Sequence, residues 1–257
     1  MLAALLMLIA RATAHDFVLE VSPAAVAVDG KAKVYGVVAH QTERETRLQR
    51  IATLTRLDAW VGGAAATITE PVSFRGPPSH WGWVPTGTAG VVPVAYANSG
   101  SEVSLPHENF VGYVRDEGDD RMVDVAKGLS GEQKEHYRRS LKALVRVGDV
   151  TEGFDAVVGL PLELVPQSDP FARPATGELT VLLLADGKPE SGVKVRAFPM
   201  NGHAENDAVV GRTDDAGKVT LAMPERDGGW VVAAVTMTHE AGREHPWHST
   251  WTSLRLP

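Results

Sequence analysis

Short apolar runs separated by turn residues fill the first third of the chain. The runs are 17–21, 33–38, 50–57, 64–69 and 91–97, and a turn at Asp29-Gly30 lies between the first two. Runs of β-branched and aromatic residues that end in Gly, Asn or Asp are typical of strands. Strands at this spacing, with no helical period between them, are typical of a sandwich or barrel. The pattern therefore predicts a β-sandwich for the first part of the protein.

Two segments further along have helical character. In 107–116, apolar residues recur at three- and four-residue steps, which is the period of a helix. Ser130 and Gln133 form a capping box, and the apolar face that follows ends at a glycine. We therefore expect two helices, 107–116 and 131–147, inserted in the first β-domain. The acidic run between them, 116–124, lacks the oxygen spacing of an EF-hand and is interpreted as a solvated turn.

The second part of the chain again has the pattern of strands. A strand is expected within 155–165, and a proline-rich linker follows it. Beyond the linker, strands or hairpins are expected at 177–184, 193–198, 213–221, 229–235 and 251–256. The predicted fold class is therefore mainly β, with two sandwich domains of Ig-like or transthyretin-like type. The domains are expected at 15–166, with the helical insertion at about 107–147, and at 172–257.

The first 14 residues have the features of a signal peptide. An apolar run, 2–10, precedes Ala12-Thr13-Ala14, which is the small-residue pattern of a cleavage site. The run is too short to cross a bilayer, which requires about 20 apolar residues. We expect cleavage after Ala14, a periplasmic location, and a mature protein that begins at His15 and does not span the membrane.

Charge and cysteine content exclude several classes of function. The net charge of −7 argues against nucleic acid as a partner. The chain has no cysteine, so disulfides, thiolate metal sites and cysteine nucleophiles are excluded together. The sequence also lacks a nucleophile elbow, a phosphate-binding glycine loop and an HExxH motif. These observations favour a binding protein over an enzyme.

Without thiolates, histidine is the natural ligand for a transition metal, and the chain has nine. After cleavage, the α-amine and ring of His15 can hold the same ion. His40, at the end of a strand, is its expected partner. His239, His245 and His248 fall within ten residues between the last two strands and are candidates for a second group of ligands. The alternative for each is an ordinary polar side chain on the surface.

Two further histidines have more modest expected roles. His107 stands at the start of the first predicted helix, where we expect it to act as a cap. His136 lies in the second predicted helix and is expected to face solvent. Nitrogen ligands in a tetragonal arrangement suit copper(II) or nickel(II) best, so either metal is compatible with the candidate residues.

An ordered set of phrases resembles one family. They are HDFVLE at 15–20, LPHENFVGYVRDEG at 105–118, EHYRRSLKALVRVG at 135–148, VVGLPLELVPQSDP at 157–170 and GRTDDAGKVTLAMPERDGGWVVAA at 211–234. In this order and spacing, the chain resembles a periplasmic family catalogued as a domain of unknown function. Members are commonly described as the periplasmic component of nickel or cobalt uptake (NikM-like or NikK-like). The second domain also resembles the carboxypeptidase-regulatory or transthyretin-like sandwich.

The resemblance implies an exported protein that binds nickel or cobalt and has a membrane metal transporter as its partner. The first functional hypothesis is therefore the soluble component of metal uptake, or a metal chaperone. The second is a copper enzyme, because an N-terminal histidine on a β-sandwich is also the arrangement of copper monooxygenases. The third is a metal-free sandwich that acts as a binding or adhesion module.

Overall fold

The computed structural model describes residues 16–39, 44–46, 53–69, 81–172, 177–200, 208–224 and 228–257. The protein is mainly β, as the sequence pattern predicts, with two short helices. Within these ranges, no helix is both long and apolar enough to cross a membrane.

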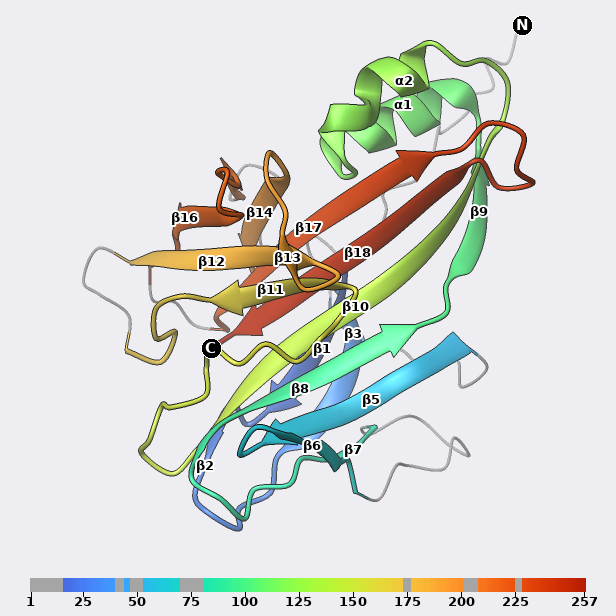
Figure 1. Ribbon diagram of the computed structural model, residues 1–257. Coiled ribbons are helices and arrows are strands. Elements are labelled where there is room, and N and C mark those ends of the chain that lie inside the picture. The colour runs from blue at the N-terminus through green and yellow to red at the C-terminus, as the bar shows by residue number, and fades with distance from the viewer. Residues whose placement is uncertain are drawn as a thin grey trace, which may run out of the picture.

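A 10-stranded sheet runs through the whole molecule (Figure 1). Along its main path lie β15 (Val209–Arg212), β14 (Lys194–Pro199), β17 (Trp230–His239), β18 (Trp247–Leu256), β10 (Gln133–Val147), β8 (Gly90–Asn98), β5 (Leu54–Val61) and β6 (Ala64–Thr67). Two more strands, β2 (Ala25–Val26) and β9 (Ser101–Leu105), also pair with β10. The parallel pairing of β10 with β18 joins strands from the two sides of the predicted linker in one sheet.

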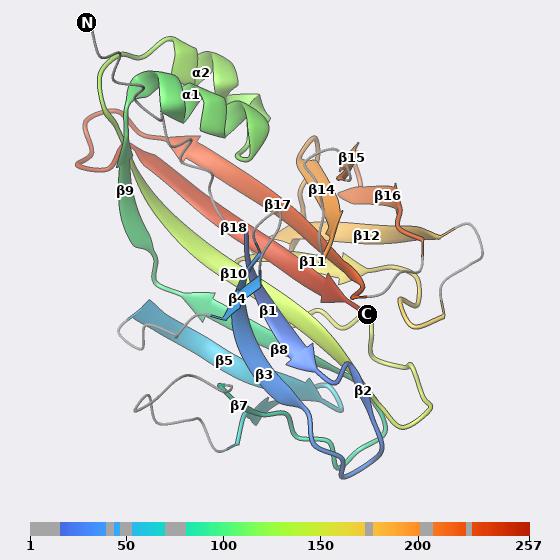
Figure 2. The ribbon, with the colours of Figure 1, turned by 180° about the vertical axis from the view of Figure 1, so that it is seen from behind.

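Two smaller sheets pack on opposite faces of the large one (Figures 1 and 2). One contains β1 (Asp16–Ser22), β3 (Lys33–Ala39), β4 (Arg44–Thr46) and β7 (Gly82–Trp83). The other contains β11 (Leu162–Pro166), β12 (Glu178–Ala185), β13 (Lys188–Pro189) and β16 (Lys218–Ala222). Successive side chains of a strand point to opposite faces. Accordingly Leu144 of β10 packs in the core beneath β11 and β12, while its neighbours Ala143 and Val145 pack in the core beneath β1 and β3.

The segment predicted as a second helix, 131–147, is a strand, and this prediction is wrong. The 15 residues of β10 exchange backbone hydrogen bonds with β18, β8 and β9, which satisfy its amide groups as a helix would. Gln133 does not complete a capping box, because its amide donates to the carbonyls of Ser130 and Gly131. Since both faces of β10 are covered, residues 140–145 are all buried instead of alternating between buried and exposed.

A buried ion pair connects β10 to β11. Lys142 donates to Glu163, and each side chain is only 1% exposed. Glu163 also accepts hydrogen bonds from the backbone N–H groups of residues 158–160. Burial lowers the pKa of Lys142, and the Glu163 carboxylate opposes this effect. Through Glu163, the pair fixes the loop at 158–160 that leads into β11. We therefore assign it a structural role.

Between β9 and β10 the chain forms α1 (His107–Asp116), the 3-10 turn η2 (Asp120–Met122) and α2 (Val123–Lys127). The first predicted helix is therefore confirmed. The two helices cover one end of the large sheet. The buried residues of the core between them are Phe110, Tyr113, Val114, Ala126, Val235, Met237, Trp247 and Trp251. His107 does not cap α1. Its Nε2 lies 3.0 Å from the Ala126 carbonyl oxygen and ties α1 to α2.

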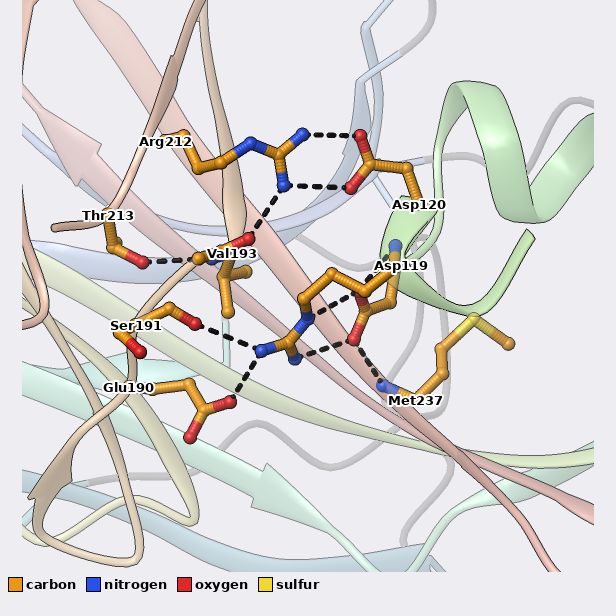
Figure 3. A network of polar contacts seen from close by, with 10 residues as sticks. Asp119, Asp120, Glu190, Ser191, Val193, Arg212, Thr213 and Met237 are labelled. Carbon is orange, nitrogen blue, oxygen red and sulfur yellow. Dashed lines mark hydrogen bonds and ion pairs between the residues drawn. The ribbon is translucent and has the colours of Figure 1, made fainter. Parts of the chain in front are cut away.

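The acidic run does not form a solvated turn, so this interpretation is wrong. Asp119 is 1% exposed and accepts from the Arg121 guanidinium at 2.7 Å and from the Met237 amide at 3.1 Å (Figure 3). Arg121 in turn donates to Glu190 at 2.9 Å. These contacts hold the helical segment to β17 and to the loop that follows β13.

A second arginine also holds the helical segment to the C-terminal part of the chain. Arg212 of β15 binds both carboxylate oxygens of Asp120, at 3.1 and 2.7 Å, and the Gly192 carbonyl (Figure 3). The hydrogen bond from Arg212 lowers the pKa of Asp120. The segment predicted as a hairpin, 213–221, contains a tight turn followed by β16, and β15 ends just before it. The strands β15 and β16 pair with β14 and β12, in different sheets.

Candidate metal-binding site

The first two predicted ligands, His15 and His40, lie outside the described residues. Each is adjacent in sequence to a residue at the end of the β1–β3 ladder. Asp16 and Ala39 are antiparallel partners there, and the register continues without interruption to Ser22 and Lys33. The fold therefore brings together the two chain segments that lead to His15 and His40.

The three predicted ligands near the C-terminus do not share one face of the sheet. His239 is the last residue of β17 and pairs with Trp247, whereas His248 of β18 pairs with Thr238. Because adjacent residues of a strand alternate between faces, His239 and His248 point to opposite sides. The His239 ring packs on Trp247, with ring centroids 4.7 Å apart. His239 is thus separated from the other two histidines.

His248 lies beside a histidine, His136, that the sequence predicts to face solvent from a helix. His136 of β10 is the parallel partner of His248, and their ring centroids are 6.0 Å apart. Lys142 points toward β11, where it binds Glu163. His136 precedes Lys142 by an even number of residues in the same strand, so its side chain points to the same face. Both histidines therefore lie on the face that β11 and β12 cover further along. No local signal indicates this pair, because it depends on two strands that are far apart in the sequence.

Two more polar residues lie beside this pair. Glu102 of β9 is the antiparallel partner of His136 on its other side. Its Oε2 is 3.4 Å from Nε2 of His245, in the turn between β17 and β18. The Glu102 side chain is 63% exposed and that of His245 is 20% exposed. We refer to Glu102, His136, His245 and His248 as the histidine cluster.

The surroundings of His136 favour its neutral form. Burial lowers its pKa most, the nearby His248 and Arg138 lower it further, and Glu102 opposes them. A neutral imidazole offers a nitrogen lone pair to a metal ion, whereas an imidazolium does not. At neutral pH, His136 is therefore available as a ligand.

Gly100 provides the space that the His136 ring occupies. A Cβ atom at this position would lie 2.5 Å from both Cε1 and Nε2 of the ring and 2.8 Å from the Tyr137 carbonyl oxygen. Its φ of 109° is also in the region that favours glycine. A larger residue would displace the ring from its position beside His248.

Among the residues that the structure describes, no three His, Cys, Asp or Glu side chains are arranged as a set of ligands for one ion. The histidine cluster provides one close pair of imidazoles, with a carboxylate and a third imidazole alongside.

A family model described as "Domain of unknown function (DUF4198)" matches residues 12–238. The chain belongs to this family. The match covers most of both halves of the protein, including β10 and the helical segment, so the architecture described above is that of a DUF4198 chain. Comparison with curated proteins and with solved structures gave no match.

Proposed function

We propose that the mature protein is an exported binding protein for a divalent transition metal ion. In this proposal it is the soluble, periplasmic component of nickel or cobalt uptake, or a metal chaperone, and a membrane metal transporter is its partner. The observation that carries the proposal is the pairing of Asp16 with Ala39, the described neighbours of His15 and His40.

The chemistry of the proposed site follows from the cleavage after Ala14. A free α-amine has a pKa near 8 and loses its proton on metal binding at neutral pH. The amine and the ring Nδ1 of His15 then close a chelate ring around the ion. An extension of the β1–β3 register by one pair would put residues 15 and 40 opposite each other, so His40 supplies the third nitrogen.

The donor set agrees with the metals that the resemblance implies. Nitrogen ligands suit nickel, cobalt and copper, and the affinity of a given site increases from cobalt to nickel to copper. Three nitrogens leave coordination positions for water, which a transporter's ligands can replace. This exchange is what a carrier requires, because it must release its ion to a partner.

The test compares two forms of the mature protein by calorimetric titration with Ni²⁺, Co²⁺ and Cu²⁺. One form begins at His15, and the other has one extra alanine before it, which converts the amine to an amide. We expect the extension to weaken binding by at least about tenfold, a loss that even changes outside the ligand shell often cause. His40→Gln is expected to have a similar effect, and His203→Gln serves as the matched control.

Equal affinity of the two forms would refute the N-terminal chelate. Rapid oxygen consumption by the copper-loaded protein with a reductant would instead favour the copper enzyme. The absence of any binding by the form that begins at His15 would favour the metal-free module.

A further inference from the structure

The imidazoles of His136 and His248 are at a separation that one metal ion can bridge. A metal–nitrogen bond of about 2.1 Å puts each ring centre roughly 3.2 Å from the ion, so two rings that share an ion have centres at most about 6.5 Å apart. The observed centroid separation is 6.0 Å, with an interplanar angle of 58°. The Cε1 and Nε2 atoms of His136 lie beside Gly100, so a shared ion requires the His136 side chain to turn toward His248.

The backbone that carries the two histidines is fixed on both strands. They are partners within a continuous parallel ladder that extends from Glu135 and Trp247 to Ala143 and Arg255. Their sequence neighbours Glu135 and Trp247 are buried on the opposite face. There Glu135 accepts a hydrogen bond from Tyr113, and Trp247 donates one to Gln133. A pair held in this way loses little conformational entropy when it binds an ion.

The ring nitrogens are not used elsewhere in the fold. Within the described part of the chain, neither His136 nor His248 donates or accepts a hydrogen bond. In Figure 1, the sheet of β11 and β12 lies across the other end of β17 and β18, away from the end beside β9. The two rings are only partly buried, so an ion can reach them from solvent.

A carboxylate is available as a third ligand. Glu102 lies across from His136 on the neighbouring strand, and its exposed side chain contacts His245. Two imidazoles and one carboxylate are donors that suit zinc, nickel, cobalt and copper. The single negative charge of the carboxylate also offsets part of the charge of a divalent ion.

We propose that His136 and His248 form a second site for a divalent transition metal ion. The two rings and Glu102 would turn onto the ion from the separate positions that they have in the structure, and water would fill the remaining positions. This site is independent of the N-terminal chelate, because it uses different residues on a different sheet. The contact with His245 holds Glu102 near the pair. The lowered pKa of His136 agrees with this role.

The experiment uses the mature chain with the extra alanine, so that the proposed N-terminal chelate is absent. Calorimetric titration with Zn²⁺ and Ni²⁺ should still show one equivalent bound. His136→Asn and His248→Asn should each weaken this binding by at least about tenfold. His239→Asn is the matched control, because His239 lies on β17, the other neighbour of β18, and faces the opposite side of the sheet. It should bind as the parent does.

A second measurement does not depend on how the variants fold. Co²⁺ added to the unmutated extended chain should broaden the ring NMR signals of His136 and His248 before those of His107 and His239. No binding by the extended chain, or equal loss in the His239→Asn control, would overturn the second site. Either result leaves the comparison of the two N-terminal forms intact, so failure of one site is distinguishable from failure of the other.

Discussion

At the scale of single residues, the neighbours of a side chain depend on the secondary structure around it. In a helix, His136 would share a face with Ser140, four residues later. In β10 it instead lies between Glu102 and His248, on two other strands. Asp119 shows the same dependence, since a residue expected in solvent is buried against Arg121 and the Met237 amide. The side chains with the most specific chemistry are therefore placed by long-range pairing.

The ion pair of Lys142 and Glu163 should matter for stability mainly because removal of one partner leaves the other charge buried and unpaired. Glu163→Ala leaves a buried ammonium group and three backbone amides without their acceptor, so we expect a loss of about 3–5 kcal/mol of unfolding free energy. The double variant Lys142→Met with Glu163→Leu removes both charges and should lose less than Glu163→Ala. Urea unfolding followed by tryptophan fluorescence measures both changes. A loss below about 1 kcal/mol for Glu163→Ala would show that water replaces the missing partner.

At the scale of elements, β10 shows how weak local preferences are against a sheet. Its sequence has a capping signal and many charged residues with good helix propensity, but propensity differences amount to less than about 1 kcal/mol per residue. As a strand, the segment has partners on both edges and cores on both faces. α1 is different, because its apolar residues follow one helical face and the opposite face meets solvent. Its local pattern and its tertiary contacts agree.

The helical segment should depend on Asp119. Asp119→Ala leaves the buried Met237 amide without its acceptor, which costs about 1–3 kcal/mol. The variant also removes the ion pair with Arg121, which keeps its hydrogen bond to Glu190. We expect faster hydrogen exchange in α1 and α2 and a change in the fluorescence of Trp247 and Trp251, which lie beneath them. Asp124→Ala is the control, because that side chain is 96% exposed. Equal exchange rates in the two variants would show that the apolar core alone holds the helices in place.

At the scale of the molecule, the large sheet connects both halves of the chain. β18, near the C-terminus, pairs with β10 on one side and β17 on the other. One face of β17 and β18 is covered by β11 and β12, and the other partly by the helices that precede β10. The predicted C-terminal domain therefore pairs along β18 with β10, and both faces of its strands β17 and β18 pack against residues before position 167.

This arrangement predicts that residues 172–257 do not fold cooperatively alone. The fragment lacks β10 and β11 and exposes the apolar surface of Val235, Met237, Trp247 and Trp251. At about 25 cal/mol per Å² of apolar surface, this loss is large relative to the stability of a small domain. A thermal melt of the fragment followed by near-UV circular dichroism should show no sharp transition. A cooperative melt would instead support the predicted boundary as a true domain boundary.

The sequence by itself determined the features that depend on neighbouring residues. Its β-branched runs and turns predicted a mainly β protein, and the helical period predicted α1. Cleavage after Ala14 and metal binding stay predictions, since His15 and His40 lie outside the described residues. Only the tertiary structure decided that β10 is a strand, that Asp119 is buried and that His136 lies beside His248. The physical reason is that a strand obtains its hydrogen bonds and burial from distant segments, which local preferences do not encode.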